Sequence, residues 1–258
     1  WTAWRAEYQP SASAGRLHAQ GLAALSEASP LRAARLFEQA IAADSDFIAA
    51  HAALATAYAE TDQYDAARDT LLNATAIGDR RWHLGRVESA WLAAAKAAVT
   101  RQLPQAAAQY SRLATLANGR ERDAARLLRA RFLDQAGQTD EAIAAAGEVV
   151  NGDPSNAAAR VQWALLLCRK QEYGRAGTEF ARAEAALAGP DQQEALADLL
   201  LARSTRLRNQ SREAQQRDLD RVEAIAERIG SRHHRIAAMF RRAELLQIDR
   251  RYDEAIAL

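Results

Sequence analysis

A three-residue pattern recurs seven times along this chain and constrains its fold more than any other feature. A small residue is followed four positions later by a larger residue and three positions after that by another apolar one, as in Ala176, Phe180 and Ala183. This spacing lies on one face of an α-helix. Copies begin at Ala33, Ala67, Ala106, Ala142 and Ala176, and weaker copies begin at Ala214 and Ala255, at intervals of 34, 39, 36, 34, 38 and 41 residues. Repetition at this period predicts stacked helical units.

Each copy is preceded by a second predicted helix, such as the one near residues 48–60. Turn signals such as Asp62-Gln63 separate the two helices, and Gly189-Pro190 closes the fifth unit. We therefore expect about 13 or 14 antiparallel helices over residues 14–258 and no strand. Small side chains let helices approach closely, so Ala176 is expected at a tight crossing with Phe180 buried beside it.

These residues resemble the tetratricopeptide (TPR) repeat, W-x2-L-G-x2-Y followed by A-x3-F-x2-A and P. The second half of the motif is well kept, whereas His51, Ala55 and Tyr58 stand at the tryptophan, glycine and tyrosine positions of the first half. In the fourth unit Arg126 and Arg129 fall where apolar residues are expected. The resemblance implies an all-α, right-handed α-α superhelix, a TPR solenoid of about seven helix-turn-helix repeats. Residues 1–13 would be an N-terminal lead-in segment, and residues 14–258 the solenoid with its last repeat truncated.

A narrower resemblance concerns residues 16–25, 33–40, Asp46-Phe47 and Arg80-Arg81-Trp82. They are similar to the C-terminal TPR regions of membrane-bound bacterial transcriptional regulators with a winged-helix domain, and of TPR-containing Ser/Thr kinases. This implies bacterial signal transduction and a covalently attached winged-helix or kinase domain, although neither signature occurs in these residues. It favours the periplasm over the cytoplasm, while the single cysteine, Cys168, decides neither.

Composition and motifs argue against catalysis. No serine-nucleophile, Walker or dinucleotide motif occurs, and the adjacent His233 and His234 point about 100° apart on a helix and have no metal-ligand partners in sequence. We therefore predict no enzyme activity, no metal and no cofactor. The formal net charge is +1, which gives no field for nucleic acid, and no apolar run is long enough for membrane insertion.

The inward-facing positions of the first helices predict a concave groove for a partner. Its candidate residues are Glu88, Trp91, Leu127, Arg131, Asp134, Gln135, Val161, Leu165 and Arg169. Trp91 has two interpretations, an anchor for a partner or a core residue between neighbouring helices, and the second is favoured. Trp1 and Trp4 have two as well, a cap on the first repeat or an anchor for a preceding segment.

The sequence therefore predicts a protein–protein interaction module that receives a partner helix or peptide in this groove. The alternative is a sensory domain that binds a small molecule and relays it to an attached DNA-binding or kinase domain. At the other end of the chain, Met239, Phe240 and Leu246 are expected near an exposed edge. Further repeats or a neighbouring molecule would cover that edge.

Overall fold

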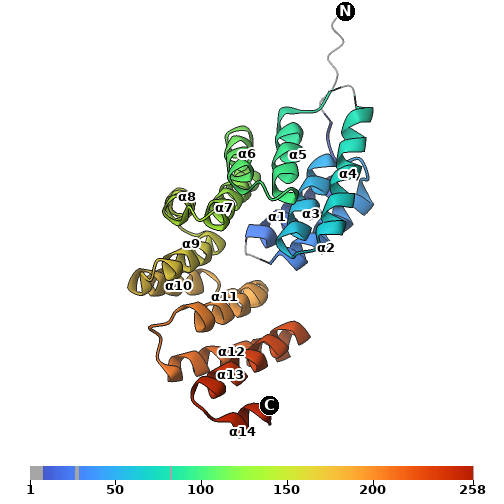
Figure 1. Ribbon diagram of the computed structural model, residues 1–258. Coiled ribbons are helices and arrows are strands. Elements are labelled where there is room, and N and C mark those ends of the chain that lie inside the picture. Colours follow the sequence, from blue (N-terminus) through green and yellow to red (C-terminus); the bar gives the residue numbers. More distant parts are fainter. Residues whose placement is uncertain (1–7, 27–28, 82, 258) are drawn as a thin grey trace, which may run out of the picture. The chain divides into compact units, whose positions relative to one another are not determined.

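The computed structural model describes residues 8–26, 29–81 and 83–257, and these are almost entirely helical (Figure 1). Within them it contains fourteen α-helices, one short 3-10 helix and no strand, so the predicted all-α fold of stacked helix pairs is confirmed. The helix expected near residues 48–60 is α3, with the bounds Ile48–Glu60. Trp1, Trp4 and Trp82, which entered the sequence analysis, lie outside the described residues.

The chain divides into two compact units, residues 1–149 and residues 150–258. Unit 1 holds α1 (Ala12–Ser26), α2 (Pro30–Ala43), α3, α4 (Tyr64–Arg80), α5 (Arg86–Val99), α6 (Leu103–Leu116) and α7 (Gly119–Gln135). Helix α8 (Thr139–Gly152) spans the boundary. Unit 2 holds α9 (Ala157–Arg169), α10 (Tyr173–Ala186), η1 (Pro190–Gln192), α11 (Gln193–Arg206), α12 (Arg212–Ile229), α13 (Arg232–Ile248) and α14 (Tyr252–Ile256).

Helix α3 lies at the centre of unit 1 and packs against α2, α4 and α5. Its first ten residues, Ile48–Ala57, are all buried, which is possible because most of them are alanines that let neighbouring helices approach closely. Helix α1 packs against α2 and also against α7, three helix pairs further along the chain. The first helices of the pairs in this unit therefore pack against one another, α1 against α7 and α3 against α5, around an interior filled by side chains.

The repeated pattern forms the core. Ala176 and Phe180 are both fully buried, as predicted, and so are Ala33 and Phe37 in the first copy. A Cβ atom on Gly21 of α1 would lie 2.4 Å from Cε1 of Phe37, so only glycine fits at this crossing.

The turn inside most helix pairs has one repeated geometry. Three residues separate the helices, and the middle one has a left-handed backbone, with φ of 59° at Asp62, 56° at Arg101, 81° at Gly137, 61° at Gln171 and 60° at Arg250. The N–H of the third residue donates to a carbonyl five positions earlier; in the first of these turns Gln63 N donates to Tyr58 O over 3.0 Å. This bond satisfies a carbonyl at the helix end, as in a Schellman motif.

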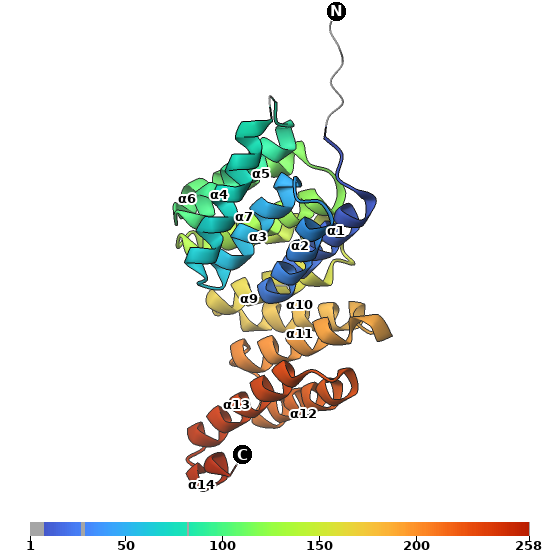
Figure 2. The same ribbon diagram turned by 90° about the vertical axis from the view of Figure 1, so that its right-hand side faces the viewer.

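Unit 2 is stacked in the order of the chain, with α11 packed against α9, α10, α12 and α13 (Figure 2). Buried arginine–carboxylate pairs join its helices. Arg160 of α9 pairs with Glu179 of α10, and Arg203 of α11 forms a bidentate pair with Asp218 of α12 at 2.9 and 2.6 Å.

In the fourth unit the leucines of α7, and not the arginines beside them, face the core. Leu127 and Leu128 are buried, while Arg126 and Arg129 are half-buried at the helix edge. Arg126 lies 3.9 Å from Asp123, and Arg129 lies 3.6 Å from Glu148 of α8. The arginines at the expected apolar positions are accommodated because their stems cover the helix surface while their charged ends reach carboxylates.

Candidate interaction surfaces

The nine predicted groove residues fall into both units, six in unit 1 and three in unit 2. In unit 1, Trp91 is fully buried and its Nε1 donates to Glu121 Oε1 over 2.5 Å. Leu127 is 1% exposed. Trp91 therefore has the core position that the sequence favoured, and neither side chain offers a surface to a partner in this structure.

Aromatic rings fill the interior around Trp91. We call His18, Phe37, Phe47, Trp91, Tyr110 and Phe132 the aromatic cluster. Trp91 meets Tyr110 edge-on with ring centroids 6.0 Å apart, and Tyr110 stacks on Phe132 at 5.4 Å. The Tyr110 hydroxyl also bonds Thr56 Oγ1 over 2.8 Å. Because these rings come from α1, α2, α5, α6, α7 and the residue before α3, the inner face of unit 1 is occupied by its own side chains.

Arg131 of α7 makes contacts within the chain. Its guanidinium lies 3.1 Å from Glu60 Oε2 on α3 and donates to the Ser26 carbonyl at the end of α1 over 3.1 Å. The Arg131 and Glu60 side chains are only 13% and 8% exposed. Burial raises the pKa of the Glu60 carboxyl, and the neighbouring Arg131 opposes that shift. Arg131 thus ties α7 to α1 and α3.

The other three predicted residues of unit 1 are nearer the surface. Glu88 is half-buried, pairs with Arg81 at 2.8 Å and accepts from Gly85 N at 3.2 Å. Asp134 is half-buried and accepts from Thr139 Oγ1 at 3.3 Å, and Gln135 is exposed. These contacts hold helix ends, so the structure does not bring the six residues together as one open groove.

In unit 2, Val161, Leu165 and Arg169 lie four residues apart on one face of α9. Val161 and Leu165 are half-buried and Arg169 is exposed. This face presents two apolar side chains followed by a cation, and Val161 and Leu165 are the apolar residues of the predicted groove that keep some exposed surface.

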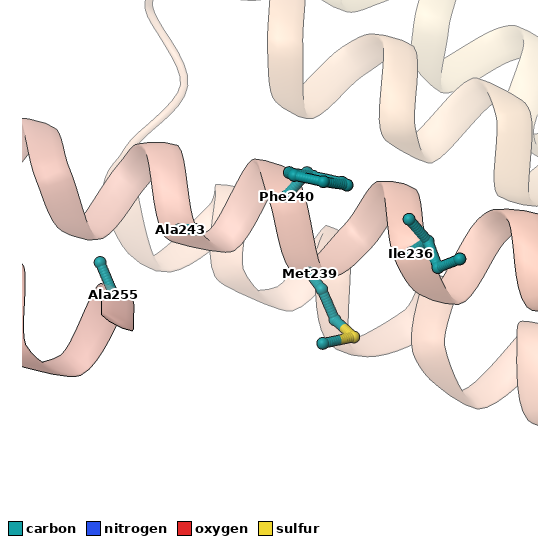
Figure 3. A pocket seen from close by; sticks show the side chains of 5 residues that line it. All are labelled: Ile236, Met239, Phe240, Ala243 and Ala255. Atoms are coloured by element: carbon teal, nitrogen blue, oxygen red, sulfur yellow. The ribbon is translucent and has the colours of Figure 1, made fainter. Parts of the chain in front are cut away.

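The end of unit 2 carries most of the exposed large hydrophobic residues of the described chain. Seven of its nine exposed large hydrophobic residues lie between Ile229 and Ile256. Ile236, Met239, Phe240, Ala243 and Ala255 line a pocket of about 280 Å³ between α13 and α14 (Figure 3). The sequence analysis placed Met239, Phe240 and Leu246 near an exposed edge; the first two are exposed, whereas Leu246 is half-buried and does not line the pocket. Ile236 and Ala243 could have been added from their spacing of three and four residues on the same helix.

A serine, a histidine and an aspartate form a hydrogen-bonded chain at the start of α13. Ser231 Oγ lies 2.7 Å from His234 Nδ1, and His234 Nε2 lies 3.0 Å from Asp198 Oδ1 of α11. Ser231 is the N-cap of α13, and its Oγ accepts from the His234 backbone N–H. The arrangement is a helix cap that fastens α13 to α11.

Among the residues with described placement, no three histidine, cysteine or acidic side chains are grouped so that they could hold a metal ion. None of the described helices combines the length and the apolar character needed to cross a bilayer.

Comparison with known proteins agrees with the repeat. A family model described as tetratricopeptide repeat matches residues 24–86, from the end of α1 to the start of α5. This match supports the presence of TPR repeats in the chain. No curated protein matches the chain.

Solved structures resemble the chain at low identity. PilW, a type IV pilus biogenesis factor, is 14% identical with a TM-score of 0.50 over 87% of this chain and 97% of its own. YrrB, described as a TPR protein with an unusual peptide-binding site, is 15% identical with a TM-score of 0.43 over 79% of this chain and 96% of its own. The P58(IPK) TPR domain is 13% identical with a TM-score of 0.26 over 95% and 81%. At such identities the likeness concerns the fold alone.

Proposed function

We propose that this chain is a non-enzymatic protein–protein interaction module that binds a partner helix or peptide on α9. One observation carries the proposal: of the apolar residues in the predicted groove, Val161 and Leu165 keep exposed surface beside the exposed Arg169, whereas Trp91 and Leu127 are buried in the interior of unit 1. TPR proteins generally act in this way.

The α9 face fits a defined ligand chemistry. Val161 and Leu165 are one helical turn apart and Arg169 follows one turn later. A bound segment would place two apolar side chains on the first pair and a carboxylate near the guanidinium. The context that we propose, a bacterial signalling or transcriptional regulator with an attached winged-helix or kinase domain, is supported by the sequence resemblance described above.

Site-specific photocrosslinking tests the proposal. A benzophenone amino acid at Leu165 should crosslink to a protein partner in cells, while one at Leu72, an exposed residue of α4, should not. In a separate pull-down with the chain that carries no benzophenone, the Leu165→Glu substitution should abolish binding of the same partner. Equal crosslinking from both positions would overturn the proposal.

A thermal-shift screen tests the rival sensory function. A small molecule at 100 times its dissociation constant should add about 2.7 kcal/mol to the free energy of unfolding. Such a hit, without a crosslinked protein at Leu165, would favour the sensory domain over the interaction module.

A further inference from the structure

The apolar pocket between α13 and α14 has the shape and surroundings of a docking site. We call Ile236, Met239, Phe240, Ala243 and Ala255 the end patch. Ile236 and Met239 are each 41% exposed and Phe240 is 70% exposed. Figure 3 shows Ile236 about one turn of α13 away from the neighbouring residues Met239 and Phe240, with Ala255 of α14 across from Ala243. Contiguous apolar surface of this kind typically marks an interaction site.

The preceding helix pair of unit 2 shows what covers such a surface. The pair α11/α12 is covered by one helix, α13, which buries Ala238 and Leu245. At its edges Arg241 donates to the Ser204 carbonyl at 2.8 Å, and Arg242 lies 2.9 Å from Asp220. The end patch, on the pair α13/α14, continues this stacking interface. Its occupant is therefore a helix with a narrow apolar stripe and charged flanks.

Positively charged side chains lie beside the end patch and favour an acidic partner. Helix α13 has four arginines and one glutamate, Glu244. Arg241 and Arg242 are bound within unit 2, whereas Arg232 and Arg235 are exposed. These two lie one turn before Ile236 and Met239, so each stands beside a patch residue on the same helix face.

We propose that the end patch binds an acidic amphipathic helix of a partner protein. Its apolar residues, spaced three and four apart, would lie along Ile236, Met239 and Phe240, and its carboxylates would pair with Arg232 and Arg235. A second copy of this chain docked by the same face would bring two further exposed arginines into the contact, which like-charge repulsion disfavours. The proposal extends the interaction function, but it uses a surface separate from α9, so either can fail alone.

The chain contains its own reporter, because Met239 is its only methionine. With ¹³C-methyl methionine the Met239 methyl gives one resonance at the patch, which Met239→Leu identifies. Two 18-residue helical peptides with the same leucine stripe are compared, one with glutamate flanks and one with lysine flanks. The glutamate peptide should shift the signal saturably, and the lysine peptide should not.

Variants locate the contact. Phe240→Ser should weaken the glutamate peptide about tenfold or more, as expected for a central apolar anchor. Leu72→Ser, at a residue of α4 that is 60% exposed, is the matched control and should leave affinity unchanged. Combined Arg232→Glu and Arg235→Glu should reverse the preference toward the lysine peptide. Circular dichroism checks that each variant is folded.

Other occupants give different results. A methyl shift that depends on protein concentration without peptide would show a second copy at the patch. A shift with phosphatidylglycerol vesicles and none with peptide would show a membrane surface. Equal binding of both peptides, no shift with either, or an unaltered affinity in Phe240→Ser would also overturn the proposal. Loss of the Leu165 crosslink would leave it standing, because α9 is not part of the patch.

Discussion

The two units bury the interior of their helix pairs with different chemistry. Unit 1 uses mainly the aromatic cluster around the alanine-rich helix α3, whose first ten residues are buried, together with the Arg131–Glu60 pair. Unit 2 joins its helices through Arg160–Glu179, Arg203–Asp218 and His234–Asp198. Rings fill space without needing partners, whereas a buried charge needs its partner in place. The comparison teaches that one repeat motif, an alanine at the crossing with a large residue beside it, fits both a closed interior and an open stack.

Trp91→Ala tests the aromatic interior and should have the largest effect. Removing a fully buried tryptophan leaves a cavity and also leaves Glu121 without its Nε1–H donor, so unfolding should become easier by about 3–5 kcal/mol. Urea unfolding measures the loss. Hydrogen exchange should rise in α5 and α7 first. A smaller loss in Trp91→Phe, which keeps most of the ring volume, is the control.

Asp218→Ala tests the charged interior of unit 2. It leaves Arg203, whose side chain is 13% exposed, with Glu184 alone, and should cost about 3 kcal/mol. Replacing both partners, as Arg203→Met with Asp218→Leu, should recover most of that loss because no buried charge remains unpaired. A double mutant as unstable as Asp218→Ala would show that the pair is not a unit.

The pH dependence of unit 1 should follow His18. Burial among the rings lowers the pKa of this imidazole to about 4, with the Ala49 backbone opposing the shift. Between pH 6.5 and pH 4, His18 is protonated in the unfolded chain, where its pKa is about 6.5, but stays neutral in the folded chain. The free energy of unfolding therefore falls as the pH drops below 6.5. The loss between pH 8 and pH 5 should be about 2 kcal/mol.

Urea titrations at several pH values measure this loss against His18→Leu. The variant removes the His18 imidazole and leaves the other buried titratable groups, such as Glu60 and His51, in place. Identical pH profiles for the two chains would contradict the assignment to His18.

Ala176→Leu should have the smallest effect of the four. Overpacking this fully buried crossing in unit 2 should cost about 1–2 kcal/mol. Ala181→Leu, on an exposed position of the same helix α10, is the matched control and should change the melting temperature little. Equal melting temperatures for both variants and the parent chain would mean that the crossing tolerates larger side chains.

The sequence predicted the helix pairs because their signals are local. The spacing of Ala33 from Phe37, and the turn residues between helices, depend only on neighbours along the chain. The groove was less predictable because burial of Trp91 depends on Glu121 and Tyr110, 30 and 19 residues away in sequence. Arg131 illustrates the same limit, since it bonds Ser26 at a separation of 105 residues. No periodicity within α7 signals that contact.

Glycine substitutions in the repeated turn should raise the thermal stability of the chain. At Asp62, Arg101, Gln171 and Arg250 a residue with a Cβ atom has the left-handed backbone that glycine has at Gly137. Side chains resist that conformation by about 1 kcal/mol each. Because each turn lies between the two helices of a pair, glycine could be introduced in turn after turn while α9 and the end patch keep their residues. The same helix pairs could thus serve an organism at a higher growth temperature without any change in what they recognise.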